Sequence, residues 1–269
     1  MDYKKVGVVG ARGWVGRSMM GLFPHAVGYD VGQGQGPVAG KFVDMMEGLT
    51  DRDFVFICVP TPQKENGQCD TSIVENAIRQ LHELNGNSIL VIRSTVEIGT
   101  TDRLAKELGH KIVFQPEYLG ETQQHPFLDP RTRPFVILGG EREAIRETAN
   151  LYKTAYNAEV SYYFSDAKTA ELCKYMENSF LATKVIFCNE FLDIAEAMGI
   201  DYNELRELWL ADFRIGRSHS DVYPKKRGFS GKCLPKDTAA LVHSAEKAGI
   251  EPKLMKTVRE INQRKYQNP

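Results

Sequence analysis

The chain has 269 residues, of which 42% are hydrophobic and 26% charged, enough for one large core or two modest ones. Its formal net charge of −1, with no basic block, membrane-length apolar run or signal peptide, argues against nucleic acid and membrane partners. Five scattered cysteines without metal-ligand spacing argue against a disulfide framework and a bound metal, so we expect a cytoplasmic protein.

The first predicted strand, Lys5–Val9, runs into a glycine turn and a helical pattern. Such a turn lets the backbone approach a dinucleotide pyrophosphate at a helix N-terminus. Asp30, after a second strand at Ala26–Tyr29, is spaced to accept both ribose hydroxyls, which favours NAD over NADP. The spacing is G-x-x-G-x-x-G, so an ordinary glycine turn stays open on the motif alone. The predicted cofactor-binding residues here are Gly10, Arg12, Gly13, Trp14, Val15, Gly16 and Asp30.

Strand and helix patterns alternate up to residue 164, which predicts an α/β fold: a Rossmann-like, doubly wound and mostly parallel sheet over residues 1–164. Its ligand should lie over the carboxyl ends of the strands. The interval between Asp30 and Phe54 is too short for a full βαβ crossover. We therefore expect the part of the NAD site that binds the adenine to be smaller than usual. Further strands are predicted at Phe54–Val59, Ser88–Arg93, Lys111–Phe114, Phe135–Leu138 and Ala158–Tyr162, and helices at Thr71–Leu84, Thr100–Leu108 and Arg142–Tyr156.

Residues 165–269 are predicted to form an all-helical second domain. A single helix is expected from Asp166 to Met198, apolar on more than one face, so it must bury against more than its own small domain. We interpret this helix as the core of a homodimer. Shorter helices are predicted at Tyr202–Leu210, at Thr238–Ala248 and from Pro252.

Cys233 lies between a glycine turn and a Pro-Lys-Asp sequence that opens a helical pattern. Pro235 suits the first turn of a helix, and the helix dipole with Lys232 and Lys236 favours a thiolate at Cys233. A thiolate in an accessible turn is a candidate nucleophile, whereas most cysteines are buried small hydrophobes. On local grounds both interpretations stay open.

Six ordered segments then form a pattern over nearly the whole chain. They are Phe56–Pro62 with Asp70–Ser72, Ser94–Val96 with Gly99–Thr101, Pro116–Glu121, the stretch around Lys174 and Asn178, Phe180–Lys184, and Gly228–Asp237 with Ser230 in place of a glycine. With them the chain resembles the UDP-glucose/GDP-mannose dehydrogenase family, NAD-dependent enzymes that oxidise a nucleotide sugar from alcohol to acid. The resemblance implies NAD as cofactor, with further contacts from Val59, Pro60, Thr61, Ser94, Thr95 and Glu121.

The resemblance also implies the chemical roles, with UDP-glucose to UDP-glucuronate as the leading reaction. Cys233 would add to the sugar aldehyde and carry it through a thiohemiacetal and a thioester. Lys174 and Asn178, four residues apart on one helix face, would stabilise the oxyanion.

Asp237 and Thr95 match family residues that hold the catalytic water, and Glu117 matches a general base acting through water or Lys174. Arg214 matches an arginine that reaches the sugar of the neighbouring subunit. The implied substrate-binding residues are Glu117, Tyr118, Leu119, Glu121, Lys174, Asn178, Arg214, Phe229 and Gly231.

Besides the short interval between Asp30 and Phe54, the chain departs from the family in two respects. The family continues past Asn262 into a third, nucleotide-binding domain, whereas this sequence stops at Pro269, as a truncation, a compact natural form or a chain covered by another. Arg93 and Gln115 stand where the family usually has Lys and Asn, yet the catalytic residues remain, which favours activity.

Two alternatives stay open: a two-electron dehydrogenase of the hydroxyacid type, which needs no cysteine, and a non-catalytic NAD-binding dimerisation module. The yield of NADH per sugar separates the three hypotheses, as two, one or none. The sequence does not identify the sugar or the nucleotide.

Overall fold

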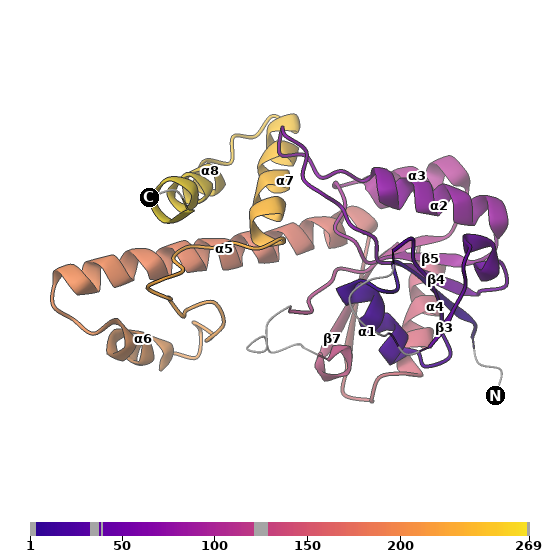
Figure 1. Cartoon of the computed structure of the whole chain (residues 1–269), viewed down its shortest axis with the longest axis horizontal. Helices are drawn as coiled ribbons and strands as arrows, with labels where there is room; N and C mark the ends of the chain where they lie inside the picture. The colour runs from indigo at the N-terminus through magenta and orange to yellow at the C-terminus, as the bar shows by residue number, and fades with distance from the viewer. Residues whose placement is uncertain (1–3, 33–37, 39, 121–128, 268–269) are drawn as a thin grey trace. The chain divides into compact units, whose positions relative to one another are not determined.

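A computed structural model describes residues 4–32, 38, 40–120 and 129–267 of the chain (Figure 1). The chain divides into two compact units. Unit 1 comprises Met1–Pro62 and Cys69–Lys174, and unit 2 comprises Gln63–Gln68 and Tyr175–Pro269. The domain division predicted between residues 164 and 165 remains a prediction from the sequence.

Unit 1 is built on an eight-stranded sheet in the order β3-β2-β1-β4-β5-β6-β7-β8. All neighbouring strands are parallel except β6 and β7, which are antiparallel. This confirms the predicted Rossmann-like, mostly parallel sheet. The strands are β1 (Val6–Val9), β2 (Val27–Tyr29), β3 (Lys41–Phe42), β4 (Phe54–Ile57), β5 (Ile89–Ile92), β6 (Ile112–Phe114), β7 (Phe135–Gly140) and β8 (Ser161–Ser165).

Helices cover both faces of this sheet. Helices α1 (Trp14–Leu22) and α4 (Arg142–Lys153) lie on one face, and α2 (Ser72–Leu84) and α3 (Thr100–Leu108) on the other (Figure 1). Strand β4 shows why both faces are apolar: Phe54 and Phe56 pack in one core, and Val55 and Ile57 pack in the other. The near-continuous apolar strands of the sequence are therefore the buried centre of a two-sided sheet.

The second crossover of the sheet is reduced, as predicted. Strand β3 has only two residues and pairs with β2 through Val27↔Lys41 and Gly28↔Phe42. In the described part of the connection from β2 to β3 there is no helix. A two-residue edge strand has no periodicity to detect, which is why the sequence did not predict it.

Unit 2 is helical. Helix α5 (Ala167–Ala197) begins in unit 1 and continues into unit 2, which confirms the predicted long helix. Helix α7 starts at Leu234, earlier than the predicted Thr238, because Pro235 and Asp237 suit a first helical turn. The remaining elements are α6 (Tyr202–Leu210), α8 (Lys253–Ile261), a π-helical turn at Asn262–Gln267, and the short 3₁₀ turns Met46–Leu49 and Pro130–Thr132 of unit 1.

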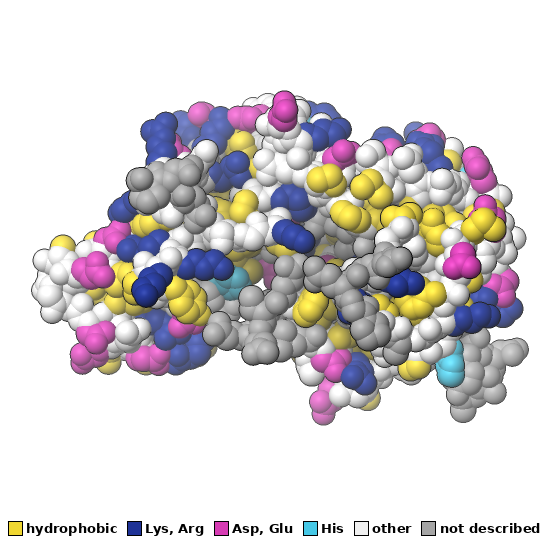
Figure 2. Space-filling view, in the orientation of Figure 1, with side chains coloured by type: hydrophobic (Ala, Val, Ile, Leu, Met, Phe, Trp, Pro, Cys, Tyr) yellow, Lys and Arg dark blue, Asp and Glu magenta, His cyan; other side chains and the backbone are white. Residues whose placement is uncertain are grey.

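The surface of α5 carries a stripe of exposed apolar side chains at helical spacing. The α5 stripe comprises Leu172, Met176, Phe180, Phe187, Phe191 and Ile194 of the helix, together with Met198 directly after its last residue. Elsewhere, Figure 2 shows basic and acidic side chains interspersed on the face drawn, in keeping with the net charge of −1. Among the described residues, no helix combines the length and hydropathy needed to cross a bilayer.

Two glycines, Gly10 in the first turn and Gly16 in α1, lie so close to neighbouring backbone atoms that a side chain would not fit. Gly10 has φ of +77°, and a Cβ there would lie 2.6 Å from the carbonyl oxygen of Cys58. A Cβ at Gly16, inside α1, would lie 2.1 Å from the carbonyl oxygen of Gly10. Helix α1 can therefore approach the turn only because position 16 has no side chain.

We expect Gly16→Ala to destabilise unit 1 by about 1–3 kcal/mol, because the added methyl group forces α1 away from the turn. Gly21→Ala is the matched control, since Gly21 lies exposed on the same helix and a Cβ there meets nothing within 4 Å. That change should be neutral or stabilise by up to about 1 kcal/mol. Urea unfolding of both variants checks this, and equal midpoints would contradict it.

Candidate functional site

The glycine turn is fixed to the end of β2 by backbone and carboxylate contacts. The backbone N–H groups of Gly10 and Ala11 donate to the carbonyl of Tyr29, at 2.9 and 3.2 Å. The Asp30 carboxylate accepts from the N–H of Arg12 at 2.8 Å and of Gly32 at 3.0 Å. The predicted cofactor residues of this turn and Asp30 are thus one local structure. Gly13 is the N-cap of α1 and offers no side chain, which leaves N–H groups at the helix start.

A second group of predicted cofactor residues follows β4 and β5. The hydroxyl of Ser94 donates to the carbonyl of Val59 at 2.6 Å, which ties the ends of the two strands together. Pro60 and Thr61 continue from Val59, and the carbonyl of Thr95 accepts from the thiol of Cys69 at 3.4 Å. Strands β1, β4 and β5 are neighbours in the sheet, so both groups lie at the same edge. This is the edge at which parallel sheets bind ligands.

Glu117 lies in an ion cluster with two arginines, and its side chain is only 11% exposed. One carboxylate oxygen contacts the Arg93 guanidinium, and the other accepts from Arg133 at 3.3 Å and from the N–H groups of Tyr118 and Leu119, both at 2.6 Å. Burial would raise the pKa of Glu117, but the two positive charges and the two backbone donors outweigh it and lower the pKa below its usual value. Glu117 is therefore held ionised, with both oxygens occupied.

Arg93 and Gln115, which replace the usual Lys and Asn of the family, each have a specific buried partner. Arg93, with a fully buried side chain, makes the contact with Glu117, and Gln115 accepts a hydrogen bond from the hydroxyl of Tyr152. Burial raises the pKa of Tyr152 well above its usual value, so its hydroxyl stays protonated and can donate. The larger side chains at positions 93 and 115 are thus accommodated by specific buried partners.

Lys174 is buried in unit 1, near the loop that follows Glu117. Its ammonium lies 4.8 Å from the centre of the Tyr118 ring, a cation–π contact. The Tyr118 hydroxyl also lies 3.8 Å from the thiol of Cys173, the residue before Lys174. Unit 1 therefore brings together Glu117, Tyr118, Leu119 and Lys174.

Unit 2 brings Asn178 and Asp237 together. The amide of Asn178 donates to the Asp237 carboxylate at 2.5 Å, and both side chains are buried. Lys236 contacts the same carboxylate at 2.6 Å. Asp237 belongs to the first turn of α7, so this pair fixes the start of that helix to α5. Lys174 precedes Asn178 by one helical turn on α5, as the sequence predicted.

Cys233 is the N-cap of α7 and the only cysteine classed as exposed among the described residues. Its exposure and its place at a helix start meet two conditions for a reactive thiol. By contrast, Cys58 is only partly exposed, and loss of hydration raises the pKa of its thiol to about 12. Phe229 is buried in unit 2, and Gly231 has φ of +86° between it and Cys233.

Arg214 is exposed and pairs with Asp212 at 2.5 Å. The loop that carries it is anchored by Lys184 of α5, whose buried ammonium donates to the carbonyls of Ile215 and Gly216. Burial lowers the pKa of Lys184. Glu121 lies outside the described residues.

Sequence reasoning missed several residues that hold the site. Arg133 contacts Glu117, and Asn189 and Asn262 bind the backbone of Gly228 and Phe229. None of them lies in a motif or at a periodic spacing from its partner, so no local signal identified them. Among the described residues, no three His, Cys, Asp or Glu side chains are grouped to hold a metal ion.

Two segments of the chain match two domains of one known protein family. Residues 40–156 match the NAD binding domain of the UDP-glucose/GDP-mannose dehydrogenase family, and residues 168–264 match its central domain. A UDP-glucose 6-dehydrogenase of Rickettsia typhi is 35% identical over 217 residues, which is 78% of this chain and 49% of that protein. The chain thus spans about half the length of the curated relatives it matches.

The chain is also similar to solved structures of dehydrogenases. A UDP-glucose dehydrogenase from Pyrobaculum islandicum superposes with a TM-score of 0.84 and 28% identity, over 97% of this chain and 68% of that one. A 3-hydroxyisobutyrate dehydrogenase of Mycobacterium tuberculosis gives a TM-score of 0.76 over 97% of this chain and 93% of that one. At 14% identity the latter likeness concerns the fold alone.

We expect Glu117→Gln to destabilise unit 1 by about 3–5 kcal/mol at neutral pH, because it leaves two buried guanidinium groups without a carboxylate. The folded-state pKa of Glu117 is lowered, so its contribution is present above the unfolded-state value and is lost as pH falls through the folded-state value. The difference between wild type and variant should therefore shrink in acid.

Urea unfolding at neutral and acidic pH measures that difference. Glu107→Gln is the control, because Glu107 pairs with Arg79 at the surface and its loss should change stability little. A stability difference for Glu117→Gln that is small at neutral pH, or that grows in acid, would contradict the expectation.

Proposed function

Since this chain belongs to the UDP-glucose/GDP-mannose dehydrogenase family, we propose that it catalyses the NAD-dependent, four-electron oxidation of a nucleotide sugar. UDP-glucose, oxidised to UDP-glucuronate, is the leading substrate, because that activity names relatives such as the Rickettsia typhi protein. The observation that carries the proposal is the exposed Cys233 at the N-cap of α7. A two-electron dehydrogenase has no need of such a thiol.

The first turn and its neighbours fit NAD. Gly10 and Gly16 keep side chains out of the turn, and the N–H groups at the start of α1 suit a pyrophosphate. We assign the ribose hydroxyls to Asp30, whose negative charge disfavours the 2′-phosphate of NADP. When bound, NAD supplies the hydride acceptor. Val59, Pro60, Thr61, Ser94, Thr95 and Glu121 complete the proposed cofactor contacts.

Cys233 is the proposed nucleophile. Removal of the first hydride and the hydroxyl proton converts the sugar alcohol to an aldehyde, and the thiolate then adds to the aldehyde carbon to form a thiohemiacetal. Loss of a second hydride gives a thioester, and water cleaves the C–S bond, which releases the acid and restores the thiol. Lys174 and Asn178 are assigned to the oxyanion that develops in these steps.

Proton transfer at this site cannot use Glu117 as a simple free base. Its lowered pKa and its contacts with Arg93 and Arg133 make it a weak proton acceptor, which supports a role through an intervening water or Lys174. Asp237 and Thr95 are assigned to the hydrolytic water. Burial of Asp237 beside Asn178 and Lys236 supports an orienting role.

The sugar pocket is assigned to Tyr118, Leu119, Phe229 and Gly231, and Glu121 is a further proposed substrate contact. In this division residues 1–164 bind the cofactor, and residues 165–269 carry the catalytic lysine and cysteine. A reducing, cytoplasmic location is proposed, because the five scattered cysteines of the sequence do not make a disulfide framework.

A homodimer is the proposed assembly. The α5 stripe exposes seven large apolar side chains, including Phe180 at 64% and Met176 at 72% exposure, and monomers rarely leave such a continuous patch in water. A second copy of the same helix would cover it and bury its own stripe at once. Arg214, exposed and bound only to its neighbour Asp212 in the described contacts, is assigned to the sugar of the partner subunit.

We expect Cys233→Ser to abolish sugar-acid formation while the fold is retained, because a serine hydroxyl is a far weaker nucleophile at neutral pH. The wild-type protein should yield two NADH per sugar, measured by absorbance against the amount of acid formed. Cys173→Ser, a change at a half-buried thiol outside the proposed chemistry, should retain that yield.

The yield also separates the alternatives. One NADH per sugar in the wild type would support the two-electron hydroxyacid-type enzyme, and none would support a non-catalytic NAD-binding module. Normal acid formation by Cys233→Ser would overturn the assignment of the nucleophile.

Phe180→Glu should dissociate the dimer, because it places a charge in the centre of the α5 stripe. Light scattering coupled to size exclusion measures the mass, and Glu196→Gln, at an exposed position on the opposite face of the same helix, should leave it unchanged. A monomeric mass for a fully active wild-type sample would contradict the proposal.

A further inference from the structure

Asn262 binds both backbone groups of Phe229. Its side-chain oxygen accepts from the Phe229 N–H at 2.7 Å, and its side-chain nitrogen donates to the Phe229 carbonyl at 3.0 Å. The side chain is buried, at 7% exposure, in the first residue after α8. One amide thus satisfies two buried backbone groups, as an adjacent strand would. Because each atom has a definite partner, the orientation of the amide is fixed.

Asn189 of α5 holds the two residues immediately before Phe229. Its side-chain oxygen accepts from the Gly228 N–H at 3.0 Å and from Nε of Arg227 at 2.7 Å. Its side-chain nitrogen donates to the carbonyl of Val185 at 2.7 Å. Arg227 also donates to the backbone carbonyl of Asn189 and to Asp193. Residues 227–229 are therefore anchored to both α5 and α8.

The anchored residues begin the segment that carries Cys233, which we call the cysteine loop (residues 227–233). Gly228 and Gly231 both have positive φ, at 69° and 86°, so the loop has little stiffness of its own. Residues 230–233 are exposed, and the far end of the loop enters α7, which Asn178 holds through Asp237. The position of the thiol therefore depends on anchors at the two ends.

We propose that Asn262 and Asn189 are positioning residues that set the reactivity of Cys233 by fixing the start of the cysteine loop. Neither touches the reacting atoms. They hold the backbone so that Cys233 stays at the N-cap of α7, where the helix dipole favours the thiolate. A nucleophile displaced by about 1 Å can lose on the order of a hundredfold in rate. The expected change in kcat rests on the proposed function, whereas the expected change in thiol reactivity does not.

The test measures the thiol directly. Iodoacetamide alkylation of Cys233 is followed by mass spectrometry over a range of pH in the full chain, without NAD or sugar. Asn262→Leu keeps the size of the side chain and removes both hydrogen bonds, whereas Asn262→Asp keeps the acceptor for the Phe229 N–H. Asn189→Leu tests the second anchor.

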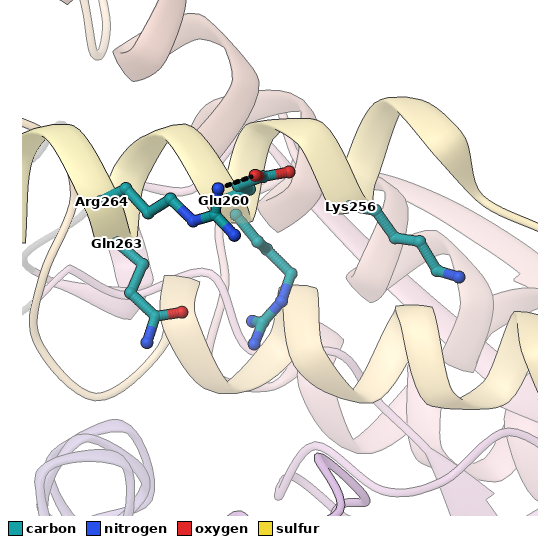
Figure 3. Close-up of a pocket in the computed structure, with 5 residues that line it drawn as sticks. Lys256, Glu260, Gln263 and Arg264 are labelled. Carbon is teal, nitrogen blue, oxygen red and sulfur yellow. Dashed lines mark ion pairs between the residues drawn. The ribbon is translucent and has the colours of Figure 1, made fainter.

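Gln263→Leu is the matched control. Gln263 is the next residue along the chain. It is exposed and lines a pocket of about 540 Å³ together with Lys256, Arg259, Glu260 and Arg264 (Figure 3). It also loses a side-chain amide, so it reports any general effect of such a change at the end of α8.

In Asn262→Leu and Asn189→Leu we expect the pH midpoint of Cys233 alkylation to rise and kcat to fall by roughly ten- to a hundredfold, with the KM for NAD unchanged. Asn262→Asp should recover part of the loss, and Gln263→Leu should match wild type. Should the leucine variants fail to fold by circular dichroism, the midpoint of Asn262→Asp decides the question.

An alkylation profile that matches wild type in every folded anchor variant would overturn the inference. A wild-type protein that yields no NADH but shows the expected alkylation shifts would refute the proposed function and retain this inference. Shifts of equal size in Gln263→Leu would also overturn it, because they would reflect a general loosening of the helix end.

Discussion

Polar side chains of a single helix, α5, hold the start of α3 and two loops that lie far from it in the sequence. Glu171 of α5 accepts from the N–H groups of Gly99 and Thr101 and so caps α3, which has no capping side chain of its own. Further along, Lys184 binds two carbonyls of the loop after Arg214, and Asn189 binds the cysteine loop. Because helical geometry fixes the spacing of these side chains, α5 determines where each loop is held.

Much of the fold could be predicted because its signals are local. The alternation of apolar strands and amphipathic helices, the glycine turn and the length of α5 all follow from patterns within short windows. The two-residue strand β3, the antiparallel pairing of β7 and the exact span of β8, which the sequence predicted at Ala158–Tyr162, depend on distant partners. Periodicity carries no information about which neighbour a strand pairs with.

The candidate site divides in the same way. Cys233, Lys174 and Asp30 lie in motifs whose residue types and spacing indicate a chemical role. Asn262 contacts Phe229 across 33 positions, and Arg133 contacts Glu117 across 16, with no motif linking either pair. These contacts are products of tertiary packing, and a lone asparagine or arginine is more often a surface residue. The proposed reacting groups could therefore be named from the sequence, whereas the residues that hold them in place could not.

The cluster of Arg93, Arg133 and Glu117 contains two positive charges and one negative charge in a buried setting. The cost of replacing a residue in evolution therefore differs between the arginines and the glutamate. Loss of one arginine leaves a neutral pair, whereas loss of the carboxylate first leaves two buried cations in mutual repulsion. Divergence at this position should therefore follow an order, with an arginine exchanged before the glutamate, and the three positions should change as a correlated set among close homologues.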